Sequence, residues 1–515
     1  MSHVRRNIIA NYLGQVWTSA MGLAFIPLYI RYLGIEAYGL IGLFSVMQAW
    51  LSLLDMGMTP TLNREMARFT SGGHSIQSIR DLLRSLELVC FSLAGLIALG
   101  VWAGSGYLAS SWLKAGQLPP AAVAQALSVM AFVVALRFVE GIYRGSLFGL
   151  QKQVWFNGAS AILATLRHGG ALAVLVWVLP SVQAFFLWQA FISLLTILVF
   201  AACVHRTLPK PPLPARFSRE AIGEVGKFAR GMLGITFLSI LLTQIDKVIL
   251  SRLLPLESFG YYTLAATVAG VLFMMVGPII QAIYPRMVEL LTLNDLDGVV
   301  QVYHRGAQLI TVLTAPLVML LVFFAQGIVF MWSGNASLAE HTTPILSVMA
   351  LGTFLNGVMN MPYQLQVAHG WTRLTLKVNL GAVVVLIPAI FWVVPHYGAL
   401  GAAWIWLSLN AVCVPVAVFF MHRRLIAQEQ WRWYLADILL PLGGSVSVLL
   451  IARFFQPAAQ QGRWHWFFFL AGSGGLALAA SSALAGQLRP RLLAALRGWL
   501  GGGSYKQRDA VQKLS

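Results

Sequence analysis

Charged side chains interrupt several long apolar stretches of this 515-residue chain. Arg167 and His168 lie about 15 Å, measured along a helix axis, inside one such stretch. Arg137, Glu140 and Arg144 lie in and directly after another such stretch, at spacings that place them on one helix face. Guanidinium groups bind phosphate oxygens through paired hydrogen bonds, so these arginines predict an anion-binding cavity. The alternatives are a structural partner for Arg167 and mutual neutralisation of Arg137 and Glu140.

A third charged group lies in a later apolar stretch. Thr236, Ser239, Thr243 and Lys247 recur at helical spacing, and Asp246 adjoins the lysine. This polar stripe indicates a helix face directed towards a wet cavity. Alternatively, Lys247 extends to the membrane surface, because it lies within about two turns of the helix end.

Asp55 lies near the end of the second apolar stretch. It shares a predicted helix face with Gln48, Ser52 and Thr59. The sequence leaves two interpretations open, a coupling or substrate-facing carboxylate and a cap or partner for Arg64 at the membrane surface.

Uncharged polar residues form two further stripes. They repeat every four residues as Asn7, Asn11 and Gln15, and as Asn356, Asn360 and Gln364. Hydrogen bonding between helices explains either stripe alone. One stripe in each half of the chain favours a shared hydrated cavity.

The elements that position these residues are membrane-spanning helices. The chain is 58% hydrophobic and only 10% charged, against about 25% charged in soluble proteins. Fourteen segments of roughly 20 residues are apolar enough to cross a bilayer, and none alternates as barrel strands do. We predict an all-α polytopic membrane protein with about 14 transmembrane helices, and we exclude a soluble enzyme and a nucleic-acid binder.

Basic residues predict the orientation of the chain. Its net charge is +18, and 27 of its 35 lysines and arginines fall at both termini and in the loops on the same side. Five fall on the opposite side. Both termini are therefore expected in the cytoplasm.

An internal repeat predicts two lobes. RYLGIEAYG at 31–39 returns as RLLPLESFG at 252–260, six spans later. Lobes of equal topology are expected to be related by an axis along the membrane normal. The expected parts are 1–207 (six spans), 208–228 (a Pro-rich, basic cytoplasmic hinge loop), 229–425 (six spans), 426–486 (two spans) and 487–515 (a basic cytoplasmic tail).

Short loops and missing motifs argue against an enzyme. The predicted outer loops are below roughly 20 residues, and no GxxxxGK[ST] phosphate loop is present. The three cysteines lack metal-ligand spacing, so neither a metal site nor a cofactor is expected. Two lobes with small loops are typical of a carrier.

Four sequence segments resemble a known family. RYLGIEAYGL (31–40), LDMGM (54–58), GSLFGLQ (145–151) and QIDKVILSRLL (244–254) followed by GYYTLA (260–265) are similar to the polysaccharide-repeat-unit (Wzx-type) flippases of the multidrug/oligosaccharidyl-lipid/polysaccharide exporter superfamily. The similarity covers about residues 5–425. Asp246 and Lys247 match a family motif, whereas Arg137, Arg167 and His168 are assigned from depth and charge alone.

The resemblance implies a function in the bacterial inner membrane. Such a protein moves undecaprenyl-diphosphate-linked oligosaccharide to the periplasmic leaflet for O-antigen, capsule or exopolysaccharide assembly. Expected partners are this lipid-linked oligosaccharide, membrane lipids, and a polysaccharide polymerase with other assembly proteins, while coupling to H⁺ or Na⁺ is left open. The alternatives are a drug or cation antiporter of the same superfamily and a flippase for lipid-linked peptidoglycan precursor.

Overall fold

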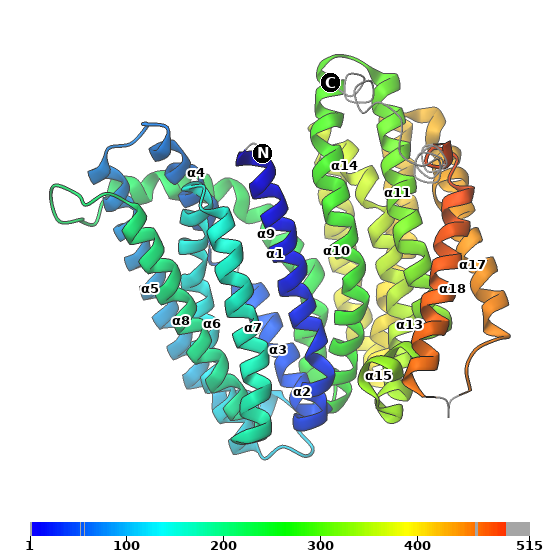
Figure 1. Ribbon diagram of the computed structural model, residues 1–515, viewed down its shortest axis with the longest axis horizontal. Helices are drawn as coiled ribbons and strands as arrows, with labels where there is room; N and C mark the ends of the chain where they lie inside the picture. The colour runs from blue at the N-terminus through cyan, green and yellow to red at the C-terminus, as the bar shows by residue number, and fades with distance from the viewer. Residues whose placement is uncertain (1–2, 52, 56, 459–461, 491–515) are drawn as a thin grey trace, which may run out of the picture. The chain divides into compact units, whose positions relative to one another are not determined.

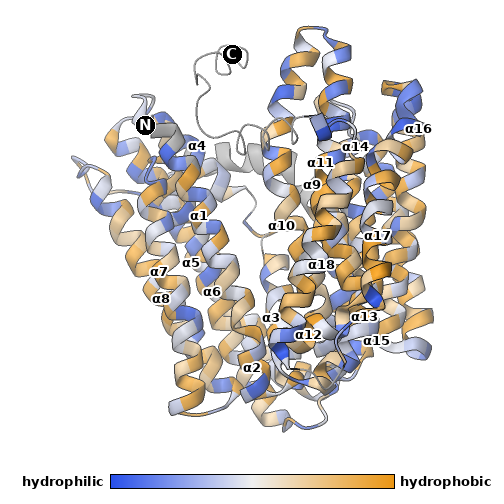
Figure 2. Ribbon diagram, turned by 45° about the vertical axis from the view of Figure 1, so that its right-hand side comes forward, coloured by the Kyte–Doolittle hydropathy of each residue, from blue (hydrophilic) through white to orange (hydrophobic). Residues whose placement is uncertain are grey.

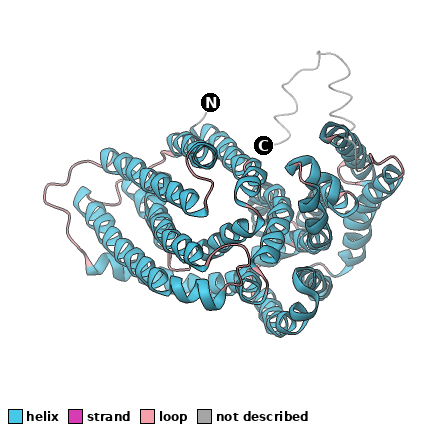
Figure 3. Cartoon of the chain, turned by 90° about the horizontal axis from the view of Figure 1, so that it is seen from below, coloured by secondary structure: helices cyan, strands magenta, loops and turns pink. Residues whose placement is uncertain are grey.

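All regular elements in the described part of the chain are helices (Figure 1). The computed structural model describes residues 3–51, 53–55, 57–458 and 462–490. Eleven helices within these ranges are long and apolar enough to cross a membrane, and apolar residues cover much of their length (Figure 2). An end-on view shows helices joined by loops (Figure 3). The expectation of an all-α polytopic membrane protein is confirmed.

The chain divides into two compact units. The first comprises Met1–Thr263 and Val383–Gly401. Its helices are α1 (His3–Ala24), α2 (Ile26–Leu33), α3 (Ile35–Leu51), α4 (Met58–Thr70), α5 (Ile76–Tyr107), the π-helix η1 (Leu108–Trp112), α6 (Pro120–Gly149), α7 (Gln153–Trp177), α8 (Val182–Thr207) and α9 (Arg219–Leu253).

The second unit comprises Leu264–Ala382 and Ala402–Ser515. Helices α10 (Leu256–Thr292) and α15 (Arg373–Leu425) cross the boundary between the units. The remaining helices are α11 (Leu296–Phe323), α12 (Ala325–Ser333), α13 (Ala336–Val358), α14 (Asn360–Ala368), the 3-10 helix η2 (Ala427–Glu429), α16 (Gln430–Arg432), the π-helix η3 (Trp433–Leu439), α17 (Leu440–Arg453) and α18 (Arg463–Leu484). The two units are defined by which helices pack together, whereas the expected lobes are defined by the sequence repeat. The lobe boundaries therefore stay a prediction.

The helices account for the fourteen expected spans. Helix α15 bends at Gly398, whose φ is +60°, so it contains two spans. Helix α9 includes the seventh expected span, and the shorter apolar helix α3 lies in the second. Helix α3 ends at Leu51, earlier than the expected residue 60, and helix α4 begins at Met58 after Gly57, which adopts a left-handed conformation.

Helix α6 lies at the centre of the first unit. It packs against α3, α4, α5, α7 and α8. A methyl group at Gly145 would lie 2.5 Å from the carbonyl oxygen of Thr59, so glycine is what lets α4 approach closely. The core of this unit surrounds α6, which carries Arg137 and Glu140.

An acidic residue organises the short helix α4 outside the membrane spans. Glu65 is buried and pairs with Arg64 at 2.6 Å, Arg68 at 2.9 Å and His74 at 2.6 Å. Burial raises the pKa of its carboxyl group, but His74 and the two arginines outweigh burial and hold this pKa below its ordinary value. The cluster fixes α4 against the beginning of α5.

Candidate functional site

A cavity of about 520 Å³ lies within the first unit, among α3, α4, α6 and α7. Three arginines and two carboxylates contribute to its wall, so its charged groups carry an excess of one positive charge. The lining residues are Gln48, Leu51, Asp55, Thr59, Pro60, Val134, Arg137, Phe138, Glu140, Gly141, Arg144 and Arg167.

Arg137 reaches this cavity with neutral partners. Its Nη1 donates to Oε1 of Gln48 at 3.0 Å, and its Nη2 donates to Oε1 of Gln189 at 3.2 Å. The guanidinium lies 5.0 Å from the ring centre of Phe44, and its buried Nε has no partner among the described residues. Amides do not neutralise a guanidinium, and Glu140 on the same helix acts on this charge through space.

Arg167 lines the same cavity from α7. Its Nη2 lies 3.9 Å from Oε2 of Glu140 and donates to Oγ1 of Thr196 at 3.3 Å. The two charged side chains are 18% and 21% exposed, and the buried Nε of Arg167 lacks a partner in the described chain. Glu140 therefore faces Arg167 through a long ion pair that a more highly charged anion can replace.

His168 points into a different environment. Its Nδ1 lies 3.1 Å from the hydroxyl of Tyr29, which also donates to the His168 carbonyl at 3.1 Å. Its ring lies 6.0 Å from that of Phe25. His168 is not among the residues that line the cavity, and its expected role in substrate binding stays a prediction.

Asp246 and Lys247 form a charge pair on α9, and Asp246 also contacts α10. The Lys247 Nζ lies 3.4 Å from Oδ1 of Asp246 and donates to the carbonyl of Thr243 at 2.9 Å. The hydroxyl of Tyr262 donates to Oδ2 of Asp246 at 2.8 Å. The side chains of Thr236 and Ser239, predicted on the same stripe, lie outside the described residues.

Asp55 combines a capping role with a place in the cavity wall. Its Oδ1 accepts from Oγ1 of Thr59 at 2.6 Å and from the Thr59 amide at 3.2 Å. The expected alternative of a helix cap is thus present, whereas Arg64 forms its ion pair with Glu65. Ser52, predicted on the same face, lies outside the described residues.

Asn11 in the first uncharged stripe links two helices. Its amide donates to Oε1 of Gln153 at 3.2 Å, and it accepts from Nδ2 of Asn157 at 2.6 Å. These bonds join α1 to α7. Bonding between helices, one of the two alternatives for this stripe, is therefore present.

The second stripe makes similar contacts in the second unit. Asn356 donates to Oδ1 of Asn410 at 3.0 Å, which joins α13 to α15. Asn360 donates to the carbonyl of Gly357 at 3.0 Å. A hydrated cavity shared by both stripes stays a prediction.

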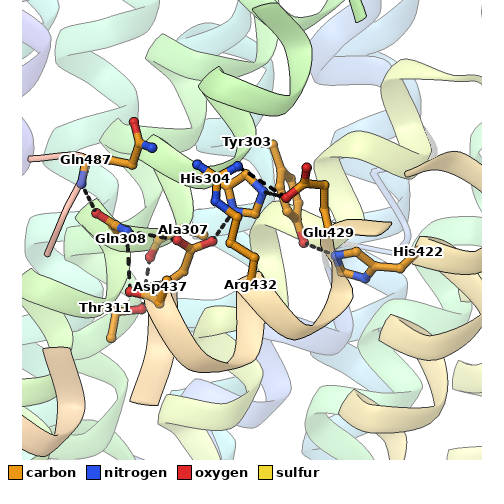
Figure 4. A network of polar contacts seen from close by, with 11 residues as sticks. Tyr303, His304, Ala307, Gln308, Thr311, His422, Glu429, Arg432, Asp437 and Gln487 are labelled. Atoms are coloured by element: carbon orange, nitrogen blue, oxygen red, sulfur yellow. Dashed lines mark hydrogen bonds and ion pairs between the residues drawn. The ribbon is translucent and has the colours of Figure 1, made fainter. Parts of the chain in front are cut away.

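A buried ionic network in the second unit was not anticipated from the sequence (Figure 4). His304 directs Nδ1 at Asp437 and Nε2 at Oε2 of Glu429, 3.0 Å away. Gln308 donates to Oδ1 of Asp437 at 2.9 Å and accepts from the amide of Gln487 at 2.9 Å. Both ring nitrogens face carboxylates, so His304 ties α11 to η2 and η3.

The sequence did not predict this network, because its residues lie far apart along the chain. His304 and Asp437 are 133 residues apart, and each lies near one end of an apolar stretch. The available signal was Asp437 itself, a carboxylate within an expected span. It lies in the π-helix η3, a helix form often found at functional sites.

Removing one partner of the buried His304–Asp437 contact is expected to destabilise the fold more than removing both. Asp437→Leu leaves the buried His304 without its fully buried partner, a loss of about 3–5 kcal/mol. The double variant His304→Leu/Asp437→Leu removes both polar groups and should be more stable than the single variant. Thermal unfolding in detergent measures the order of stability, and an Asp437→Leu variant as stable as the parent would contradict a stabilising His304–Asp437 contact.

Among the described residues, no group of three histidine, cysteine, aspartate or glutamate side chains is arranged to hold a metal ion. The cavity wall offers guanidinium, carboxylate and amide groups. Guanidinium groups are suited to bind an anion.

The fold is that of a multi-pass helical membrane protein. Two solved structures share its fold. A lipid II flippase MurJ in an inward closed conformation superposes with a TM-score of 0.69 at 12% sequence identity, over 95% of this chain and 99% of that chain. An inward-facing multidrug resistance MATE family transporter of the MOP superfamily superposes with a TM-score of 0.61 at 12% identity, over 82% of this chain and 95% of that chain. The profile of the polysaccharide biosynthesis protein family matches residues 4–291. The chain belongs to that family. A MatE profile matches residues 232–392.

Curated relatives are similar over most of the chain. A candidate O-antigen transporter of Shigella flexneri is 20% identical over 82% of this chain and 98% of its own length. The succinoglycan biosynthesis transport protein ExoT of Rhizobium meliloti is 22% identical over 82% and 84%. The teichuronic acid biosynthesis protein TuaB of Bacillus subtilis is 22% identical over 51% and 54%.

Proposed function

We propose that this protein is a flippase for undecaprenyl-diphosphate-linked oligosaccharide repeat units. It moves them from the cytoplasmic to the periplasmic leaflet of the bacterial inner membrane, by alternating access of two lobes around a central site. The observation that carries the proposal is the pair Arg137 and Arg167 on one cavity of about 520 Å³, each with a buried, unpartnered Nε. Membership of the polysaccharide biosynthesis family supports the same substrate class.

The cavity suits the diphosphate group of this substrate. Phosphate oxygens accept paired hydrogen bonds from a guanidinium, and a buried site strengthens each bond. The sugars enter the same wet space, whereas the polyprenyl chain stays in lipid. The proposed partners are the lipid-linked oligosaccharide, membrane lipids, and the polymerase and other assembly proteins of the pathway, whereas coupling to H⁺ or Na⁺ is left open.

A drug or cation antiporter is the second candidate function. Asp55 and Glu140 on the cavity wall favour it, because carboxylates bind cations. Glu140 already faces Arg167, and Asp55 accepts from Thr59. Both acids therefore have partners, so the anion function is favoured, and a flippase for lipid-linked peptidoglycan precursor is the alternative within it.

Reporter fusions are expected to place both termini in the cytoplasm. Fusions at Ser218 and in the C-terminal tail should report the cytoplasm, and fusions at Gly116 and Ser337 the periplasm, because basic residues concentrate on the first side. Paired alkaline phosphatase and fluorescent protein fusions measure the side. A periplasmic C-terminus would require an odd number of spans and contradict the two-lobe arrangement.

A further inference from the structure

Helix α8 carries a buried polar face next to the two cavity arginines. Gln189, Ser193 and Thr196 recur at intervals of four and three residues, so they lie on one side of the helix. Gln189 and Thr196 are each 2% exposed, and Ser193 is fully buried. The helix packs against both α6, which carries Arg137, and α7, which carries Arg167. None of the three polar residues is among those that line the cavity.

Two amide side chains hold the guanidinium of Arg137. Gln48 of α3 and Gln189 of α8 each direct Oε1 at it, at 3.0 and 3.2 Å. A guanidinium only donates hydrogen bonds, so the oxygens of the two amides must face it and the nitrogens must face elsewhere. The buried Nε2 of Gln48 has no partner among the described residues. The two amides therefore satisfy donors of Arg137 without adding a negative charge.

An aromatic ring completes this uncharged surrounding. The guanidinium of Arg137 lies 5.0 Å from the ring centre of Phe44. Phe186, which precedes Gln189 by one turn on α8, packs edge-on against Phe44 with the ring centres 5.4 Å apart. A ring face attracts a cation without neutralising it. Helix α8 thus fixes the position of Arg137 through neutral groups.

Arg167 also has a neutral partner on α8. Its Nη2 donates to Oγ1 of Thr196 at 3.3 Å. The Thr196 hydroxyl donates its own hydrogen to the carbonyl of Ile192 at 2.7 Å. Because a hydroxyl has a single hydrogen, Thr196 can only accept from Arg167. Apart from the long contact with Glu140, this arginine is therefore also positioned without a counterion.

These neutral partners leave the charge of the cavity intact. Arg167 acts on Arg137 as a like charge, which Glu140 partly offsets. Three arginines and two carboxylates line the cavity, so the excess is one positive charge. A carboxylate in place of either amide at Arg137 would cancel this excess.

We propose that Gln189 makes this cavity selective for anions, with Gln48 as the second amide of the pair. The proposal rests on the proposed transport function. The amide orients the guanidinium of Arg137 and leaves its charge for the diphosphate of the substrate. A carboxylate at the same place would itself pair with the guanidinium, and the cavity would then favour cations. Gln189 is a positioning residue, because it acts through Arg137.

Gln189→Glu is expected to weaken binding of undecaprenyl diphosphate by roughly 10- to 100-fold, the contribution of one hydrogen bond to a charged group. Glutamate has the shape of glutamine and still accepts from Arg137, but it neutralises the guanidinium. Binding of undecaprenol should change little, because this ligand is uncharged. Quenching of tryptophan fluorescence in detergent measures both affinities. Rhodamine 6G, a cationic dye, should bind more tightly to the variant, as fluorescence anisotropy of the dye measures.

A second variant separates the charge of the side chain from its packing. Gln189→Met has a similar shape but no acceptor, so it should unfold at a lower temperature, because a buried donor loses its partner. It should nevertheless keep the preference for the diphosphate over undecaprenol. Gln189→Glu should be at least as stable as the parent, because the buried guanidinium gains a counterion. A purely structural role of Gln189 predicts the opposite order, with the preference following stability.

The other amide provides an independent test, and a third glutamine provides the control. Gln48→Glu makes the same change from α3 and should have the same effect on both ligands, so the test does not depend on the folding of one variant. Gln183→Glu is the same substitution on α8, but Gln183 donates to the carbonyl of Ala122 at 3.2 Å and is not among the cavity-lining residues. It should keep the preference for the diphosphate.

The outcomes distinguish this proposal from the transport function on which it rests. An undiminished preference for the diphosphate in Gln189→Glu and Gln48→Glu would overturn the role of the amides. An equal loss in Gln183→Glu would do the same, because position would then not matter. A parent protein that binds undecaprenol as tightly as its diphosphate would instead contradict the flippase function itself.

Discussion

Arg167→Ala is expected to abolish polysaccharide export while the protein still inserts into the membrane. The variant removes a charged donor from the wall of the cavity and leaves Glu140 without its ion-pair partner. Each hydrogen bond to a charged group contributes about 1.5–3 kcal/mol, roughly 10- to 100-fold in affinity for a diphosphate. Surface polysaccharide, normalised to the amount of protein in the membrane, measures the effect.

Three companion variants separate charge from position. Arg167→Lys keeps the charge without the planar fork, so it should retain partial export. Arg167→Ala/Glu140→Gln removes the repelling carboxylate and should recover part of the lost affinity. Arg373→Ala removes an exposed arginine outside the cavity and should export normally. Normal surface polysaccharide in the Arg167→Ala strain would remove Arg167 from the substrate site.

The helical membrane fold could be predicted because each span carries its own signal. Roughly 20 apolar residues suffice for a helix to cross a bilayer, whatever its neighbours. The end of helix α3 could not be predicted in this way, because it depends on the left-handed Gly57 and the cap at Asp55. Apolar sequence continues through this turn and conceals it.

The depth of the cavity arginines could also be predicted, but their partners could not. Position along the span placed Arg137 and Arg167 inside the membrane. Spacing suggested Glu140 as a partner of Arg137, three residues earlier on the same helix. The structure gives Glu140 a long ion pair with Arg167 on the next helix, in addition to its electrostatic interaction with Arg137. Contacts between helices depend on helix rotation, which hydropathy does not determine.

Depth alone does not identify a substrate-facing group. His168 adjoins Arg167 in sequence, yet successive residues on a helix point about 100° apart. It consequently meets Tyr29, outside the cavity lining. Lys247 has its own acid, Asp246, which Tyr262 in turn holds. His168 and Lys247 can therefore be compared with the cavity arginines Arg137 and Arg167 in binding experiments.

The purified protein is expected to bind a polyprenyl diphosphate more tightly than the matching monophosphate or the neutral polyprenol. The diphosphate offers the most acceptor oxygens and the highest charge to Arg137 and Arg167. Its affinity should fall as salt rises, because ions screen the attraction. Quenching of intrinsic tryptophan fluorescence in detergent measures the three affinities at two ionic strengths.

Variants decide whether the cavity produces this preference. Arg137→Gln and Arg167→Gln should each weaken diphosphate binding more than polyprenol binding, because lipid-like packing alone recognises the tail. Lys247→Gln and His168→Gln are the comparison variants, because these two residues lie outside the cavity lining. Cationic dyes should compete poorly, since the charged lining residues carry a net positive charge that repels them. Equal affinity for polyprenol and its diphosphate, together with tight binding of a cationic dye, would contradict the anion cavity and favour the antiporter.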